Sequence, residues 1–158
     1  MDFPEDIYST RILEVVAAMP EMGLLACFDG RAVRHSKLCG SRVEVTVRLD
    51  EARRVAAYGH KIEACLLGQS SASVMAQQVV GLGREEIEVG RAQLLAMLKD
   101  GGAVPQGLWQ DLAVLEPVKD FKPRHASMLL VFDATLAAIE EGLQSERDAD
   151  CADQLEAE

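Results

Sequence analysis

The pattern of apolar and polar positions predicts strands in the first half of the chain and helices in the second. Residues 42–48 alternate strictly, with three valines on one side and polar residues on the other, which is typical of a strand with one face on a core. Residues 54–64 form a second extended run after a polar break, so the two segments predict an antiparallel hairpin. We expect a third strand over 32–38, at the edge of the same sheet.

Helical periodicity or a run of small residues marks the remaining elements. One helix is predicted before the strands and three after them, with a loop or short helix among the latter: 7–19, then 70–80, 84–99, 105–112 (loop or short helix) and 124–143. Strands that are followed by helices, without alternation, predict an α+β fold. We expect a three-stranded antiparallel sheet with several helices packed on one face.

Composition and charge limit the class of protein. With 158 residues, 49% hydrophobic and 27% charged, the chain predicts one globular domain, which we place at 1–145. Its formal charge of -10 disfavours a nucleic-acid partner, and no apolar run approaches the roughly 18 residues of a membrane helix. We therefore expect a cytoplasmic protein. The acidic residues 146–158 predict a solvated tail, or alternatively a segment that docks on a partner.

Two cysteines stand where structural elements are expected to meet. The sequence contains no nucleophile elbow, phosphate loop or HExxH, which disfavours an ordinary enzyme. Cys39 precedes the clearest strand, and Cys65 lies between a strand and a helix. A thiol just before a helix meets the positive end of the helix dipole, which lowers its pKa and favours a metal-binding thiolate. The alternative is that each cysteine is a small buried hydrophobic residue.

The other cysteines and two of the histidines have simpler interpretations. Cys27 lies in an apolar run and is predicted to be in the core, and Cys151 lies in the acidic tail and is assigned no role. His60 is expected to be a satisfied histidine on a strand, and His35 an edge-strand or loop residue.

The segments around Cys39 and Cys65 resemble one known family. Cys39-Gly40-Ser41 precedes a strand, and Cys65 follows 26 residues later, ahead of a serine-rich segment that ends in Met75. This is similar to the U-type iron–sulfur cluster scaffolds, which comprise the NifU amino-terminal domain and the IscU and SufU proteins. Their hallmark is Cys-Gly-Asp, then a cysteine before a serine-rich helix, then a third cysteine at the last helix. The resemblance spans about residues 5–143.

The chain departs from that family pattern at two of its ligand positions. Ser41 stands where the family has aspartate, and a hydroxyl is a weaker metal ligand. The third cysteine is missing. Aligning the family's His-Cys-Ser-Met-Leu puts Ala126 at the cysteine position, whereas aligning Arg-x-x-Cys puts Ser127 there. Neither residue is a good ligand.

The resemblance implies a carrier and not a catalyst. Cys39 and Cys65 would accept sulfur or iron, and His125, at the start of the last helix, would be a substitute ligand in a Cys39–Cys65–His125 set. Alternatively, His125 is solvated or bonded to a carbonyl. Because a cluster takes about four thiolates, this set would hold a labile iron–sulfur cluster, one completed by a second subunit, or a single Zn or Fe ion. The second hypothesis is a degenerate member that has lost metal binding and remains an interaction module. A zinc enzyme would need a general base, and none is visible.

The resemblance also implies partners, namely a cysteine desulfurase and iron–sulfur acceptor proteins. Residues 115–119 (Leu-Glu-Pro-Val-Lys) resemble the Leu-Pro-Pro-Val-Lys stretch by which an Hsp70-type chaperone recognises the IscU branch. The alternative for this segment is an ordinary proline-containing loop between two helices.

Overall fold

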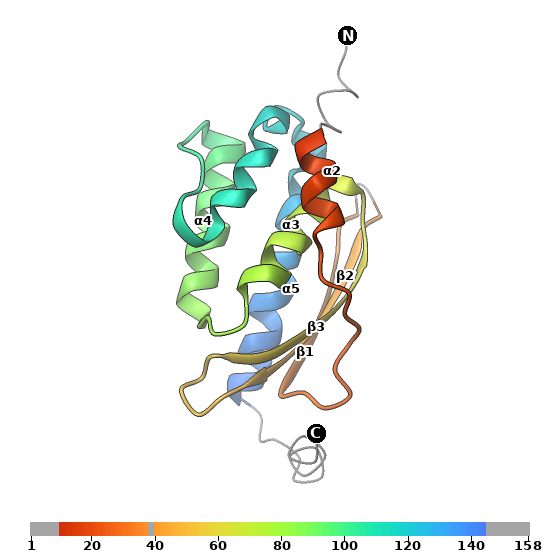
Figure 1. Ribbon diagram of the computed structural model, residues 1–158, viewed down its shortest axis with the longest axis vertical. Helices are drawn as coiled ribbons and strands as arrows, with labels where there is room; N and C mark the ends of the chain where they lie inside the picture. Colours follow the sequence, from red (N-terminus) through yellow and green to blue (C-terminus); the bar gives the residue numbers. More distant parts are fainter. Residues whose placement is uncertain (1–9, 38–39, 145–158) are drawn as a thin grey trace.

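A computed structural model describes residues 10–37 and 40–144, which form an α+β fold (Figure 1). The elements, in chain order, are α2 (Thr10–Ala17), β1 (Gly30–His35), β2 (Arg42–Leu49), β3 (Val55–Glu63), α3 (Leu66–Gln78), α4 (Arg84–Asp100), the 3₁₀ helices η1 (Gly107–Val118) and η2 (Lys122–Arg124), and α5 (His125–Gln144). The strands form one antiparallel sheet in the order β1-β2-β3. This confirms the predicted fold class. The tail predicted over 146–158 lies outside the described residues.

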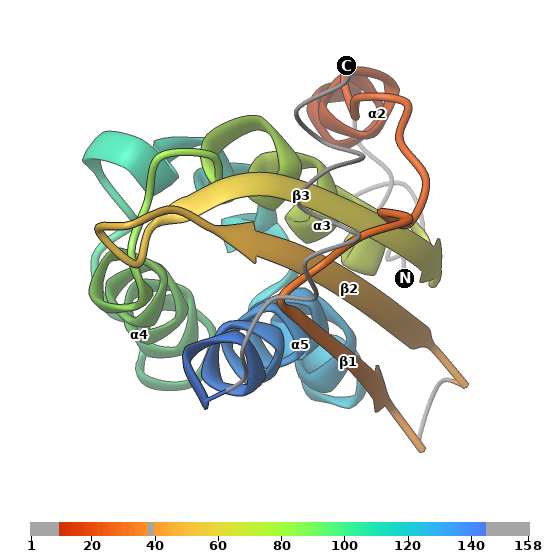
Figure 2. The same ribbon diagram turned by 90° about the horizontal axis from the view of Figure 1, so that it is seen from below.

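The helices form a layer against one face of the sheet. Helix α5 packs across β1 and β2, with α3 and α4 against it, as seen along the sheet in Figure 2. The three valines of β2 that were predicted to face a core are at most 1% exposed. From β3, the hydroxyl of Tyr58 lies 3.2 Å from the Thr135 hydroxyl of α5. The hairpin therefore presents its apolar side to α5, as the alternation predicts.

The polar face of the hairpin is also covered, which the alternation does not predict. The connection from α2 to β1 crosses this face, and the Leu25 amide donates a hydrogen bond of 3.0 Å to the Thr46 hydroxyl. Gly59 permits the crossing, because a Cβ there would lie 2.4 Å from the Gly23 carbonyl oxygen. Glu44, on the same face, is buried and ion-paired with two arginines. Thr46 is therefore satisfied by backbone groups beneath the covering segment, and Glu44 is satisfied by two arginine side chains.

Helix α3 occupies the centre of the helical layer. Nine of its thirteen residues are buried, and these are mainly small residues that let neighbouring elements approach closely. The helix begins at Leu66, four residues before the predicted start. Each helix of the described residues is too short or too polar to cross a lipid bilayer.

The segment before α5 is more regular than predicted. The expected loop or short helix over 105–112 is a 3₁₀ helix that continues to Val118. Its Trp109 ring is 2% exposed and packs directly against Gly90 of α4, where a Cβ would lie 2.5 Å from the ring. The indole N–H also donates a 3.0 Å hydrogen bond to the Glu86 carbonyl. These contacts attach η1 firmly to α4.

Candidate functional site

Cys65 caps the amino terminus of α3. Its backbone is extended (φ −67°, ψ 170°), and its carbonyl accepts a hydrogen bond of 2.9 Å from the Gln69 amide. The side-chain amide of Gln69 donates in turn to the Ala64 carbonyl, at 2.8 Å, which holds the strand-to-helix turn. The side chain of Cys65 is half-buried. The thiol thus lies at the helix start, as predicted, on a backbone fixed from both sides.

The Cys65 thiol is the first member of a chain of contacts that includes two serine hydroxyls. The Cys65 sulfur lies 3.5 Å from the Ser127 oxygen, on the first turn of α5. The Ser127 oxygen lies 3.1 Å from the oxygen of Ser41, at the start of β2. Both serines are at most 2% exposed. We call this arrangement the Cys65–Ser127–Ser41 cluster, and it brings together all three segments that carry the family resemblance.

Gly68 sets the spacing between the two helices that meet at the cluster. A Cβ at Gly68 would lie 2.7 Å from the Ser127 hydroxyl oxygen and 3.2 Å from the Ser127 carbonyl oxygen. The first turn of α3 therefore packs against α5 without an intervening side chain. Sequence reasoning did not single out Gly68, although a glycine one turn after a candidate cysteine is a detectable signal.

The two alternatives for the third ligand position differ in the structure. Ser127 is buried against Cys65, whereas Ala126 is exposed and lines a cavity to which Cys65 does not contribute. The geometry therefore favours Ser127 as the residue in the position of the missing cysteine.

Cys39 lies outside the described residues, so its predicted meeting with Cys65 stays a prediction. The chain around it is described. The Gly40 amide donates to the Ser36 carbonyl, and the Ser36 amide donates to the Ser41 carbonyl, both at 2.9 Å. Gly40 has a φ of 70°, which favours glycine. The hairpin connection that carries Cys39 thus ends at Ser41, inside the cluster.

His125 is buried at the start of α5, 6% exposed, and bonded to a backbone carbonyl. Its Nε2 lies 2.6 Å from the Lys119 carbonyl oxygen. Because a carbonyl can only accept, Nε2 carries the hydrogen, and only Nδ1 would remain for a metal. This agrees with the carbonyl-bonded alternative, and the ligand role stays a prediction. Within 10–37 and 40–144, no three His, Cys, Asp or Glu side chains gather as a metal site.

The remaining candidate residues have structural positions. Cys27 is buried, as predicted, and His35 is exposed at the end of the edge strand β1. His60 is buried on β3 edge-to-face with the Tyr58 ring, 5.8 Å between centroids. Its Nδ1 has no hydrogen-bond partner among the residues that the structure describes, so it is not the fully satisfied histidine that was expected. Burial lowers the pKa of His60.

The segment that resembles a chaperone-binding stretch is not a loop. Residues 115–118 complete η1, with Pro117 inside the helix, which corrects the proline-loop alternative. Leu115 and Val118 are 0% and 3% exposed. A chaperone that reads this stretch as an extended peptide would first have to unfold it.

Comparison with known proteins identifies the family. Neither a protein-family model nor a curated protein matches the chain. Among solved structures, a nitrogen-fixing NifU-like protein (N-terminal) from Brucella abortus matches with a TM-score of 0.84 and 42% identity. The match covers 90% of this chain and 99% of that one. The chain belongs to the U-type iron–sulfur scaffold family.

More distant structures share the fold of this U-type protein. One, from Fervidobacterium islandicum AW-1, is described as an iron–sulfur cluster assembly scaffold protein for the SUF system. It has a TM-score of 0.74 and 19% identity over 84% of this chain and 96% of that one. Another, described only as a hypothetical protein, has a TM-score of 0.70 and 23% identity over 82% and 96%. Membership of a family of scaffold proteins agrees with the prediction that this chain is not an enzyme.

Proposed function

We propose that this U-type protein carries sulfur or a metal ion for iron–sulfur cluster assembly, using Cys39 and Cys65, and passes it to acceptor proteins. The observation that supports this best is the position of the Cys65 thiol. It is half-buried at a helix start, next to a hydroxyl in the place of a missing family ligand.

The geometry of the cluster fits a small metal cargo. At a Zn–S bond of about 2.3 Å, two ligands of a tetrahedral ion lie about 3.8 Å apart. The distance of 3.5 Å between the Cys65 sulfur and the Ser127 oxygen is close to that ligand-to-ligand distance. Hydroxyls, however, are weak ligands for Zn or Fe. Cys39, and His125 through Nδ1, would complete the set, and the bound ion or cluster would be labile.

Sulfur transfer requires only one thiolate at the site, whereas a bound cluster requires several ligands. The Cys65 thiolate would attack the outer sulfur of a persulfide on a cysteine desulfurase. That sulfur–sulfur bond breaks, the desulfurase cysteine leaves as a thiolate, and Cys65 becomes the persulfide. An iron–sulfur acceptor protein would then receive the sulfur. The proposal places this exchange in the cytoplasm, where thiols stay reduced.

Metal and sulfane-sulfur analysis of protein purified without oxygen tests the proposal. We expect near-stoichiometric Zn or Fe, or a persulfide after incubation with a desulfurase and cysteine. The metal should be lost in Cys65→Ala and in Cys39→Ala, and the persulfide should be lost in Cys65→Ala, whereas Cys151→Ala, outside the proposed site, should retain both. Unchanged loading in both site variants would refute the carrier.

The second candidate is an interaction module of the assembly machinery without cargo. It is favoured by the two serines of the cluster, which stand at family ligand positions. If it is correct, wild-type protein will hold neither metal nor persulfide, yet it will still bind a desulfurase in a pull-down with purified partners.

A further inference from the structure

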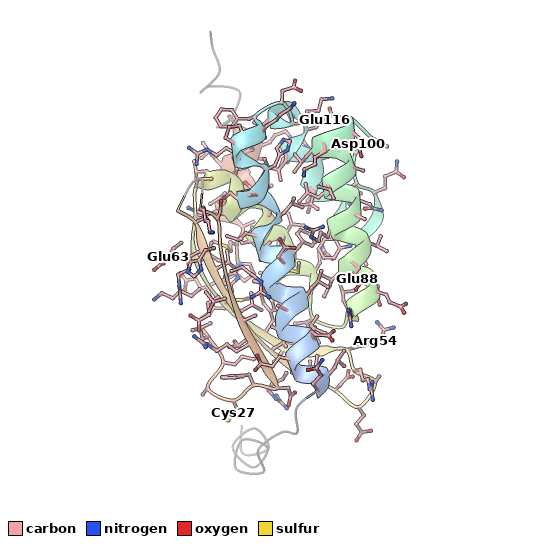
Figure 3. All side chains as sticks on the ribbon, turned by 180° about the vertical axis from the view of Figure 1, so that it is seen from behind. Cys27, Arg54, Glu63, Glu88, Asp100 and Glu116 are labelled. Atoms are coloured by element: carbon pink, nitrogen blue, oxygen red, sulfur yellow. The ribbon has the colours of Figure 1, made fainter. Side chains whose placement is uncertain are left out.

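A cavity of about 670 Å³ lies outside the cluster, over the amino-terminal half of α5. In Figure 3, α5 runs between α4 on one side and the strands on the other. Ala126, Leu129 and Leu130 of α5 line the cavity. The two leucines are only 5–6% exposed and are anchored in the core, so the apolar floor is rigid. A volume of this size is in the usual range of small-molecule sites.

The rim of the cavity is basic, although the chain as a whole is acidic. Three Lys and Arg side chains line it against a single carboxylate, Asp133, and the chain carries a formal charge of -10. Arg91 of α4 pairs with Asp133 at 2.6 Å. Lys99 of α4 and Lys122 of η2 are exposed and form no ion pair with any of the described residues. Two cations from different elements are therefore available at one concave surface.

We propose that this cavity binds a small organic anion, namely a carboxylate or phosphate attached to an apolar body. The apolar body would rest on Leu129 and Leu130, and the anionic group would lie between Lys99 and Lys122. An anion in a basic, partly enclosed cavity is attracted more strongly than at an open surface. His125, a proposed metal ligand, lines the cavity but Cys65 does not, and the anion would be held by the two lysines and the two leucines, so this inference does not require sulfur or metal carriage.

Binding of hexanoate and hexyl phosphate, measured by NMR titration of the full chain, tests the inference. We expect saturable shifts confined to amides around the cavity, and the comparison of the two compounds tells which head group is preferred. Hexanol and hexylamine supply the same apolar body without a negative charge, and inorganic phosphate supplies the charge alone. All three should bind weakly or not at all.

Substitutions at the rim distinguish binding in this cavity from a general attraction of anions to the protein. Lys99→Gln and Lys122→Gln should each weaken hexanoate about three- to fivefold. Lys61→Gln is the control, because Lys61 is an exposed lysine of β3 that does not line the cavity and has only a long contact of 3.9 Å with Glu63. Ala126→Phe retains every charge but fills the opening, and because Ala126 is exposed it should not impair folding.

Several results would overturn the inference. They are equal binding of hexylamine, loss of affinity in Lys61→Gln to the same extent as in the rim variants, unchanged affinity in Ala126→Phe, or no saturable binding at all. Binding of an acidic peptide in the absence of any binding of the small acids would assign the cavity to a protein partner instead, and would also refute the proposal.

Discussion

A thiol at position 127 should raise the metal affinity of the cluster, if the cluster carries metal as proposed. In Ser127→Cys, a second sulfur would stand at the place of an oxygen that lies 3.5 Å from the Cys65 sulfur, close to the 3.8 Å or so between two thiolates on one zinc ion. Changes around metal ligands typically alter affinity 10–100-fold. Exchanging a hydroxyl ligand for a thiolate should reach the upper end, about 100-fold, or roughly 2.7 kcal/mol.

The same substitution should reduce the stability of the metal-free protein slightly. It weakens the 3.1 Å hydrogen bond between the hydroxyls of Ser127 and Ser41, which are both buried. The net loss should be about 1 kcal/mol, which lowers the melting temperature by about 2–4 °C in a chain of this size. Added zinc should more than reverse this loss, because a ligand that binds only the folded state stabilises it.

Zinc competition against a coloured chelator, under reducing and anaerobic conditions, measures the gain. Cobalt-to-thiolate absorbance reports independently whether a further sulfur has joined the metal. Ser71→Cys is the matched control, because it adds a thiol on α3 at a buried hydroxyl that has no hydrogen-bond partner in the described part of the chain. An unchanged zinc affinity in Ser127→Cys would refute the reasoning, as would a gain that persists when Cys65→Ala is added.

Three further predictions concern the frame around the site. Gly90→Ala should destabilise the fold by about 1–3 kcal/mol in thermal or urea unfolding, because the new methyl group would overlap the Trp109 ring. Gly23→Ala, which meets no atom within 4 Å, should change stability by less than about 0.5 kcal/mol. Because burial lowers the pKa of His60, unfolding free energy should fall as pH drops below about 6.5, and urea titrations of His60→Gln should show a flatter dependence. The Arg31 guanidinium lowers the pKa of Glu44, so the stability advantage of wild type over Glu44→Gln should disappear as pH falls through that lowered pKa, below 4.5.

Local patterns were sufficient to predict the sheet and most helices. The alternation over 42–48 reflects a real difference between the two sides of β2, and acidic residues at the start of α4 agree with the helix dipole. The sequence predicts a start of α3 four residues later than the observed one, because Leu66 and Leu67 continue the apolar character of the preceding strand and Gly68 disfavours a helix. The sequence predicts a loop or short helix over 105–112, and burial of Trp109 and its neighbours stabilises a longer 3₁₀ helix over 107–118.

The cluster itself could be predicted only in part. The position of Cys65 at a helix start follows from its own neighbours in the sequence. The contacts with Ser127 and Ser41, in contrast, join residues that lie 62 and 86 positions apart. No periodicity encodes a pairing over such a distance. The resemblance to a family indicated which segments to compare, and the packing of α3 on α5 favours one of the two alignments of the last segment.

Because Gly68 packs closely against α5, either a serine or a cysteine could occupy position 127 on the same backbone. The backbones of α3 and α5 approach each other so closely here that a methyl group at position 68 would not fit between them. A serine and a cysteine at 127 would therefore project from the same scaffold toward the same sulfur, and only the projecting atom would differ. Under the proposed function, loss or recovery of a ligand at this position would require one side chain to change, with no rearrangement of the helices that present it.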